Sequence, residues 1–118
     1  MATILIITDD ASVSSFLYER LTGVGYNIDI MQSKNYDSSL KHIRRYDYIM
    51  IEQSRDLTIC KYIRHLVDDS IPIYLLTATS SAELIIKGIE AGATDFISIA
   101  LPFGDILSHI QRNDIVKY

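Results

Sequence analysis

The stretch ILIITDD, residues 4–10, decides the fold class of this chain. Four consecutive apolar residues lead directly into Thr8, Asp9 and Asp10. Such an unbroken apolar run of strand length is typical of a strand buried on both faces, as in a parallel sheet. A helical apolar period follows the two acids and stops at Gly23, because glycine commonly ends a helix. We therefore expect a buried strand, an acidic turn and a helix at the start of the chain.

The same alternation of strand and helix patterns continues along the whole chain. We predict five strands, over residues 3–7, 27–31, 46–51, 71–76 and 96–99. An apolar stripe at helical spacing follows each strand. The stripes are Val13, Phe16, Leu17 and Leu21; Tyr36, Leu40 and Ile43; Leu57, Cys60, Ile63 and Val67; Ala82, Ile86, Ile89 and Ala93; and Phe103, Ile106, Leu107 and Ile110, with Pro102 in the first turn. This alternation predicts βαβ units, and hence an α/β fold with a doubly wound sheet of five parallel strands.

Composition indicates one ordinary domain over residues 1–118. The chain is 48% hydrophobic and 22% charged, which argues against disorder. Its net charge of −4, without a basic stripe, makes the chain itself a poor DNA or RNA binder. A single cysteine, Cys60, excludes an internal disulfide and a cysteine zinc site. No apolar run is long enough to span a membrane and no basic start precedes the first strand, so we expect a cytoplasmic chain without a signal peptide.

The residues at the strand ends are the candidate functional residues, because ligands of open α/β sheets lie beyond the carboxyl ends of the strands. These residues are Thr8, Asp9, Asp10, Glu52, Thr77 and Ile99. Acids at strand ends are also common helix caps, so capping of the first helix is the alternative role for Asp9 or Asp10. For Glu52 the alternative is a solvated loop residue.

Five segments of the chain together resemble one known family over nearly the whole length. They are ILIITDD (4–10), GYNI (25–28), YDYIMIE (46–52), IPIYLLTA (71–78) and GIEAGATDFIS (88–98). The combination resembles the receiver domain of response regulators of the OmpR/PhoB type, which implies a flavodoxin-like (βα)5 receiver fold. The resemblance also implies an aspartate that carries a phosphoryl group at the end of the third strand. Two acids after the first strand would hold Mg²⁺, while a hydroxyl and a lysine would bind phosphoryl oxygens.

The sequence departs from this family at the nucleophile and at the acid pair. Glu52 stands at the nucleophile position, where its extra methylene misplaces an in-line attack. Without gaps, the acid pair falls on Thr8 and Asp9, so that one acid is lost. A slip of one residue would make Asp9 and Asp10 the pair, but it breaks the spacing to the GYNI segment.

Two further strand-end positions complete the pocket. Thr77 keeps the family's hydroxyl, whereas Ile99 replaces the lysine and has no charge for a phosphoryl group. We expect Glu52 to place its carboxylate towards Thr77, as a partial and singly charged mimic of phosphate. Phe96 stands at the switch aromatic position and should prefer a buried pose, for which plain core packing is the alternative. We therefore expect a degenerate phosphorylation pocket with no catalytic residue, no cofactor and a degenerate Mg²⁺ site, in an atypical receiver that stays in one state.

The resemblance also implies a symmetric homodimer through the face of helix four, strand five and helix five. The expected interface residues are Leu84, Ile85, Lys87, Asp95, Ile99, Leu101, Asp105 and His109. Leu84 lies about 200° around its helix from Ile86, which the apolar stripe places in the core. Because apolar residues replace charges of the family here, we expect a constitutive, hydrophobic dimer. Local packing of Leu84 and Ile85 under a loop is the alternative.

Two functions remain open. In the first, the chain is a phosphorylation-independent receiver that dimerises a C-terminal winged-helix DNA-binding domain outside these residues, and DNA is contacted only by that domain. In the second, the chain is a stand-alone pseudo-receiver adaptor that binds a protein partner. An enzyme, such as a flavin enzyme using the strand-end cleft, lacks a nucleophile–base pair and a phosphate loop here. We expect no enzyme activity, no small-molecule substrate and no membrane association.

Overall fold

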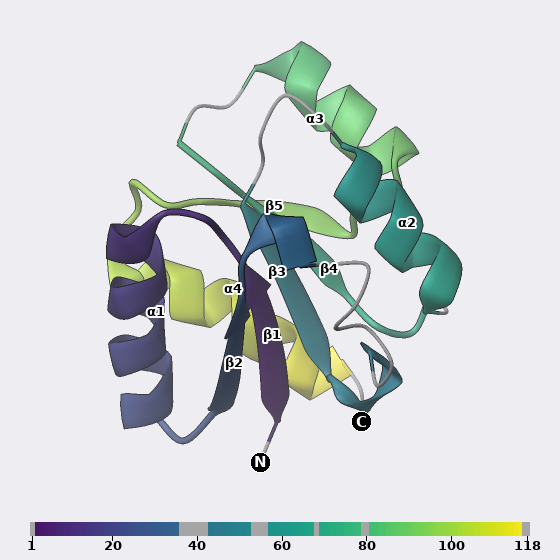
Figure 1. Ribbon diagram of the computed structural model, residues 1–118. Helices are drawn as coiled ribbons and strands as arrows, with labels where there is room; N and C mark the ends of the chain where they lie inside the picture. Colours follow the sequence, from purple (N-terminus) through teal and green to yellow (C-terminus); the bar gives the residue numbers. More distant parts are fainter. Residues whose placement is uncertain (1, 36–42, 53–56, 68, 79–80, 117–118) are drawn as a thin grey trace.

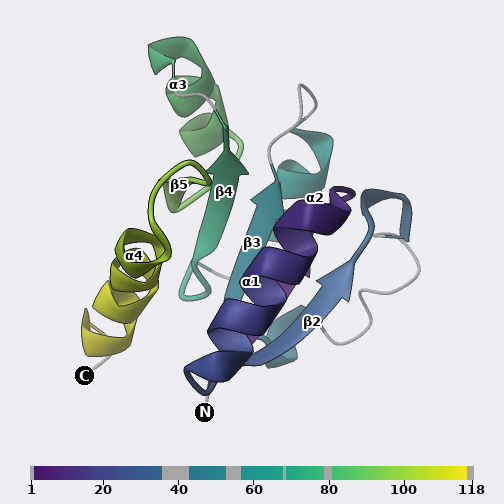
Figure 2. The same cartoon turned by 90° about the vertical axis from the view of Figure 1, so that its left-hand side faces the viewer.

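Five parallel strands form one sheet in the computed structural model, in the order β2-β1-β3-β4-β5 (Figure 1). The structure describes residues 2–35, 43–52, 57–67, 69–78 and 81–116. The strands are β1 (Thr3–Ile7), β2 (Asn27–Met31), β3 (Tyr48–Glu52), β4 (Ile73–Thr77) and β5 (Asp95–Ser98). All neighbouring strands pair in parallel, and Figure 2 shows β2, β3 and β4 pointing to the same end of the sheet. This is the doubly wound, flavodoxin-like order, so the predicted fold class is confirmed.

Four helices in the described part of the chain cover the sheet: α1 (Ala11–Gly23), α2 (Thr58–Leu66), α3 (Ala82–Glu90) and α4 (Phe103–Val116). Helices α1 and α4 lie on one face, and α2 and α3 lie on the other (Figures 1 and 2). Among the residues described, every helix is too short or too polar to cross a bilayer. The layers are therefore helix, sheet and helix, as parallel sheets require.

The segment between β2 and β3 contains short 3-10 helices where it is described. They cover Ser33–Asn35 and Ile43–Arg45. The helix predicted from the stripe of Tyr36, Leu40 and Ile43 falls largely on residues 36–42, which lie outside the described residues. Of that stripe, Ile43 is described, and it is buried in the core.

Each face of the sheet carries its own apolar core, because successive strand side chains point to opposite faces. The core under α1 and α4 consists of Ile4, Ile6, Leu17, Leu21, Ile28, Tyr48, Met50, Tyr74, Leu76, Ile97, Ile106 and Ile110. The core under α2 and α3 consists of Leu5, Ile7, Ile43, Ile49, Ile51, Cys60, Ile63, Val67, Ile73, Leu75, Ala91 and Ala93. Burial raises the pKa of the Cys60 thiol, which fits a packing role for this residue.

Helix α3 rests on the sheet through a face that the apolar pattern misassigned. Ile86 and Ile89, predicted in the core, are 58% and 48% exposed, and Ala82 is exposed as well. Gly88 is the buried residue of this helix, and Leu84 is half-buried. These two residues are four apart and share the inner face. The prediction for Ile86 and Ile89 is wrong, because α3 carries apolar residues on both sides and an apolar stripe does not show which side is covered.

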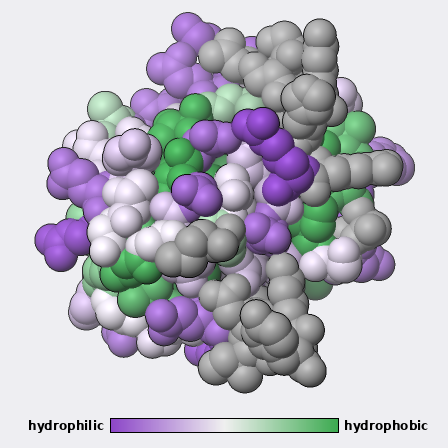
Figure 3. All heavy atoms as spheres, turned by 90° about the horizontal axis from the view of Figure 1, so that it is seen from below, coloured by the Kyte–Doolittle hydropathy of each residue, from purple (hydrophilic) through white to green (hydrophobic). Residues whose placement is uncertain are grey.

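Arg64 joins three segments at the end of the sheet where β4 and β5 begin. Its guanidinium donates hydrogen bonds to the carbonyls of Gly92 (2.8 Å) and Ile71 (3.1 Å), and to the Thr94 hydroxyl (3.3 Å). The same hydroxyl accepts a hydrogen bond from the Ile73 N–H at 3.0 Å. Gly92 has a φ of 106°, and a Cβ there would lie 2.6 Å from Arg64 Cγ, so glycine is required by both conformation and space. Seen from below, this end of the molecule shows small apolar areas between polar residues (Figure 3).

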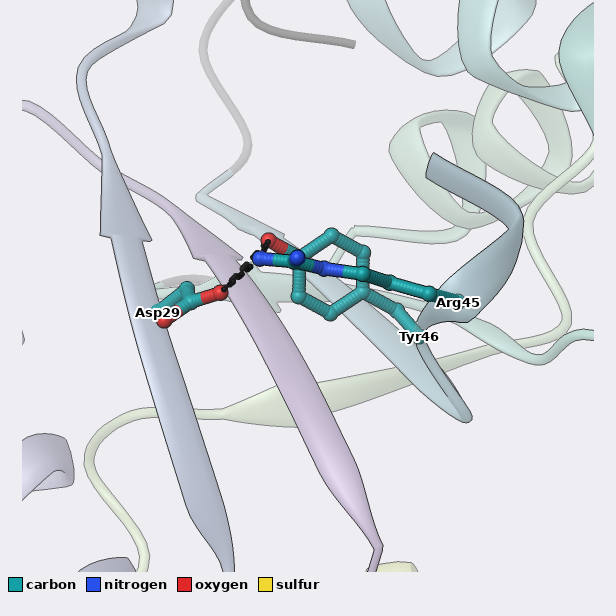
Figure 4. Close-up of polar contacts among 3 residues, drawn as sticks. All are labelled: Asp29, Arg45 and Tyr46. Atoms are coloured by element: carbon teal, nitrogen blue, oxygen red, sulfur yellow. Dashed lines mark hydrogen bonds and ion pairs between the residues drawn. The ribbon is translucent and has the colours of Figure 1, made fainter. Parts of the chain in front are cut away.

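Asp29 on the edge strand β2 forms a polar cluster with the two residues Arg45 and Tyr46, which precede β3 (Figure 4). The Tyr46 hydroxyl donates to Asp29 Oδ2 at 2.6 Å, and Arg45 Nη2 donates to the same oxygen at 3.1 Å. The Arg45 guanidinium lies 5.3 Å from the centroid of the Tyr46 ring. Burial of the ring and the bond to Asp29 raise the pKa of the Tyr46 hydroxyl. The cluster holds the chain that enters β3 against the edge of the sheet.

Removal of the Tyr46 hydroxyl should destabilise the protein. We expect Tyr46→Phe to lower the free energy of unfolding by about 1 kcal/mol, because it deletes a hydrogen bond to a carboxylate at a partly exposed site. Urea unfolding measures the change. The matched control is Tyr18→Phe, on the exposed side of α1, which should change stability by less than about 0.5 kcal/mol. Equal effects of the two substitutions would contradict a structural role for the cluster.

Candidate functional site

A hydrogen bond between Thr8 and Glu52 joins the carboxyl ends of β1 and β3. Thr8 directly follows β1, and Glu52 is the last residue of the neighbouring strand β3. The Thr8 hydroxyl donates to Glu52 Oε1 at 2.8 Å, and its oxygen accepts from the Asp10 N–H at 3.1 Å. Thr8 is only 4% exposed. Thr8 stands at a position where the family resemblance implies an acid. Its buried neutral hydroxyl instead donates a hydrogen bond to the Glu52 carboxylate.

Asp9 is bound by the 3-10 turn that follows β2. The Ser33 N–H donates to Asp9 Oδ1 at 2.8 Å, and the Ser33 hydroxyl donates to Asp9 Oδ2. These two hydrogen bonds, the hydroxyl first, lower the pKa of Asp9 below its ordinary value of 3.8. Both carboxylate oxygens of Asp9 are therefore engaged within the chain.

Asp10 is the N-cap of helix α1. Its Oδ1 accepts hydrogen bonds from the N–H groups of Ser12 (2.8 Å) and Val13 (3.3 Å). The capping role that the sequence left open for this acid pair is confirmed for Asp10, whereas Asp9 binds Ser33 instead.

A cavity of about 190 Å³ opens beside these groups. Thr8, Asp9, Ser33 and Glu52 line it, together with apolar residues of β1, β3, β4 and α2. The structure therefore brings together three of the six predicted pocket residues and adds Ser33. The sequence had no signal for Ser33, because its contact with Asp9 joins residues 24 positions apart in the chain.

These donors do not fit the magnesium ion that the resemblance implies. Mg²⁺ requires a near-octahedral set of oxygen ligands that includes one or two available carboxylates. Thr8 offers a neutral hydroxyl that is already bonded to Glu52, and both Asp9 oxygens accept from Ser33. Within the described ranges, no group of three or more His, Cys, Asp or Glu side chains could hold a metal ion.

Thr77 and Ile99 lie at other strand ends, and Phe96 lies within β5. Ile99 lines a second, apolar cavity of about 150 Å³ together with residues of α1 and α4. Thr77 is 7% exposed at the end of β4, whereas Glu52 Oε1 is bonded to Thr8 on the other side of β3. The half-buried Phe96 ring packs against the core under α2 and α3.

Lys87, Asp95 and His109, three of the four charged or titratable residues expected at a dimer face, lie close to a partner within the chain. Lys87 Nζ lies 3.0 Å from Glu83 Oε1, one helical turn away on α3. His109 Nδ1 lies 3.8 Å from Asp95 Oδ2, which links α4 to β5. Asp105 is exposed in the first turn of α4. These intramolecular pairs reduce the charge that the face offers to a partner.

Replacement of Ser33 should raise the pKa of Asp9 and change how stability depends on pH. A carboxyl with a lowered pKa in the folded state contributes stability above its unfolded pKa, and this contribution is lost as pH falls through the folded pKa. We expect Ser33→Ala to return the pKa of Asp9 towards 3.8. The stability difference from wild type should be largest above about pH 5 and shrink as the medium is acidified to about pH 3. NMR titration of the carboxyl carbon and urea unfolding at several pH values measure both effects.

The matched control is Ser14→Ala, because the Ser14 hydroxyl donates to the carbonyl of Ala11 and not to an acid. We expect its effect on stability to be independent of pH. An unchanged pKa of Asp9 in Ser33→Ala would contradict the assigned hydrogen bonds.

The chain is similar in sequence to curated response regulators, although no family model matches it. "Response regulator ArlR" of Staphylococcus aureus is 32% identical over 117 residues, which cover 94% of this chain and 52% of ArlR. The chain therefore spans about half the length of the curated relatives it matches.

Solved receiver domains share the fold of this chain. The non-phosphorylated HemR receiver domain of Leptospira biflexa matches with a TM-score of 0.81 and 22% identity, over 96% of this chain and 94% of that one. The BeF3-activated receiver domain of RstA from Klebsiella pneumoniae matches with a TM-score of 0.79 and 22% identity, over 94% and 97%. The chain is thus similar in sequence to response regulators and shares the fold of solved receiver domains.

Proposed function

We propose that this homologue of response-regulator receiver domains is the receiver of a transcriptional regulator, and that it works without phosphoryl transfer. The observation that carries the proposal is the hydrogen bond from the buried Thr8 hydroxyl to Glu52 Oε1. It engages the carboxylate that would have to attack a phosphodonor. The departures at Glu52, Thr8 and Ile99 resemble those of an atypical chlamydial regulator. The proposed location of the protein is the cytoplasm.

Three features of the pocket oppose phosphoryl transfer. The Glu52 side chain is one methylene longer than aspartate, so its oxygens are displaced from an in-line position. The acids that would hold a metal are replaced by Thr8 or occupied by Ser33. Ile99 lies in an apolar cavity and offers no charge to a developing phosphoryl anion.

A small phosphodonor should leave the protein unmodified. We expect incubation with acetyl phosphate and Mg²⁺ to add no phosphoryl group to Glu52. The carboxylate is displaced from an in-line position, the residues at the metal position are engaged or neutral, and Ile99 offers no positive charge. Intact-protein mass spectrometry under acid-free conditions measures the result. A typical receiver with an aspartate nucleophile, treated in parallel, should gain one phosphoryl group. A stoichiometric gain on Glu52 would overturn the proposal.

We further propose that the receiver forms a homodimer through α3, β5 and α4. The outer side of α3 presents Ile85, Ile86 and Ile89, which are 38%, 58% and 48% exposed, and Leu101 after β5 is 36% exposed. Lys87 pairs with Glu83, and His109 lies 3.8 Å from Asp95, so that association would depend on apolar contact more than on charge. A second copy of the same face is a suitable partner, because a two-fold interface is self-complementary.

A negative charge on the apolar side of α3 should dissociate the dimer. We expect Ile86→Glu to give a monomer across a dilution series in multi-angle light scattering, since a buried unpaired carboxylate opposes association. The matched control is Tyr18→Glu, on the exposed side of α1, and this variant should remain dimeric. An unchanged mass of Ile86→Glu would place the interface on another surface.

A wild-type protein that is monomeric at every concentration would instead favour a stand-alone adaptor. In the favoured role, the receiver dimerises a C-terminal winged-helix domain that lies outside this chain and makes all contacts to DNA. The chain spans about half the length of its curated relatives, and this supports the role because the remaining half of each relative can hold a second domain. Neither role includes catalysis or a small-molecule substrate.

A further inference from the structure

Gly88 lies where α3 crosses the aromatic ring of β5. It is the buried residue of this helix. A Cβ built on Gly88 would lie 2.3 Å from Phe96 Cζ and 2.8 Å from Leu75 Cδ1. Both distances are well below van der Waals contact. The Phe96 ring therefore occupies the space that any side chain at this helix position would need.

The backbone conformation does not explain a glycine here. Among the described residues, the glycines with positive φ are Gly25 and Gly92, so Gly88 has a φ that any residue can adopt. Glycine is also the least favourable residue after proline inside a helix. The reason for Gly88 is the room that it leaves for the Phe96 ring against the helix.

We propose that Gly88 is a seat for the Phe96 ring, and that this pair fixes the position of α3 on the sheet. The inference deepens the proposed function, because α3 also carries Ile85, Ile86 and Ile89. Gly88 and Phe96 thus become positioning residues for the proposed dimer face, which they do not themselves form.

The position of α3 depends strongly on this contact because the helix has few other inward side chains. Leu84 is half-buried and Gly88 is buried, while every other residue from 82 to 90 is exposed. Phe96 packs against the core that contains Leu75 and Ala91, so the ring connects the helix to β4 and to the start of β5. Displacement of the ring would tilt or lift the helix together with its apolar outer side.

Four proteins test the seat: wild type, Gly88→Ala, Phe96→Leu, and the double variant. We expect Gly88→Ala to lower the urea midpoint and to raise the dimer dissociation constant at least about tenfold, although alanine favours helix. In the Phe96→Leu background the ring atoms are gone, so adding Gly88→Ala should cost much less in both measurements. Urea unfolding measures the midpoint, and sedimentation over a dilution series measures the dimer dissociation constant. The comparison of the four urea midpoints does not require the protein to be a dimer. The double variant keeps the test decisive if Gly88→Ala alone does not fold.

The matched control is Gly104→Ala on α4, where a Cβ would meet nothing within 4 Å. We expect its urea midpoint to be equal to or above that of wild type. If Gly88→Ala behaves like Gly104→Ala, or costs as much in the Phe96→Leu background as in wild type, the seat is disproved. A monomeric wild type would refute the proposed dimer while the unfolding cycle still decides the seat, so the two failures are distinguishable.

Discussion

The burial of β1 on both faces is the constraint on which the rest of the structure depends. Residues Ile4–Ile7 are at most 1% exposed, and the strand pairs residue by residue with β2 on one side and β3 on the other. After Thr3 the strand offers no polar side chain until it ends. The next polar group, Thr8, therefore appears at the carboxyl end of the sheet, and the register with β3 places it beside Glu52.

Neutral donors satisfy two of the carboxylates at this end of the sheet. Burying unpaired charge is costly, and a site with two free acids and a nucleophilic carboxylate needs a cation to balance them. Here the hydroxyl of Thr8 serves Glu52, and the hydroxyl and N–H of Ser33 serve Asp9. These hydrogen bonds join the residues after β1 to the end of β3 and to the 3-10 turn that follows β2.

Helix α3 shows how one pattern can serve two surfaces. Its inner side carries Leu84 and Gly88, with Gly88 against the ring of Phe96, while Ile85, Ile86 and Ile89 are exposed. A helix that hides its backbone and exposes isoleucines is not optimised for burial within one chain. This arrangement is the physical basis for proposing that the outer side contacts a second molecule.

The sequence by itself determined the features that are local or that depend on residue chemistry. Unbroken apolar runs specified the parallel strands, and Glu52 and Ile99 marked departures from the pattern that the chain resembles. The sequence offered Asp9 or Asp10 as a helix cap, and the structure assigns the cap to Asp10. Strand starts and ends were defined less sharply: β3 begins at Tyr48 rather than Tyr46 and ends one residue later than predicted, because backbone pairing and not hydrophobicity sets these bounds.

Only the tertiary structure decided contacts between residues far apart in the chain. No sequence pattern joins Ser33 to Asp9, or Arg64 to the carbonyl of Gly92, because their geometry exists only after the sheet has formed. The covered side of α3 was also decided by packing. Hydrophobicity indicates which residues avoid water, but it does not show that Gly88 packs against Phe96 while Ile86 and Ile89 stay exposed.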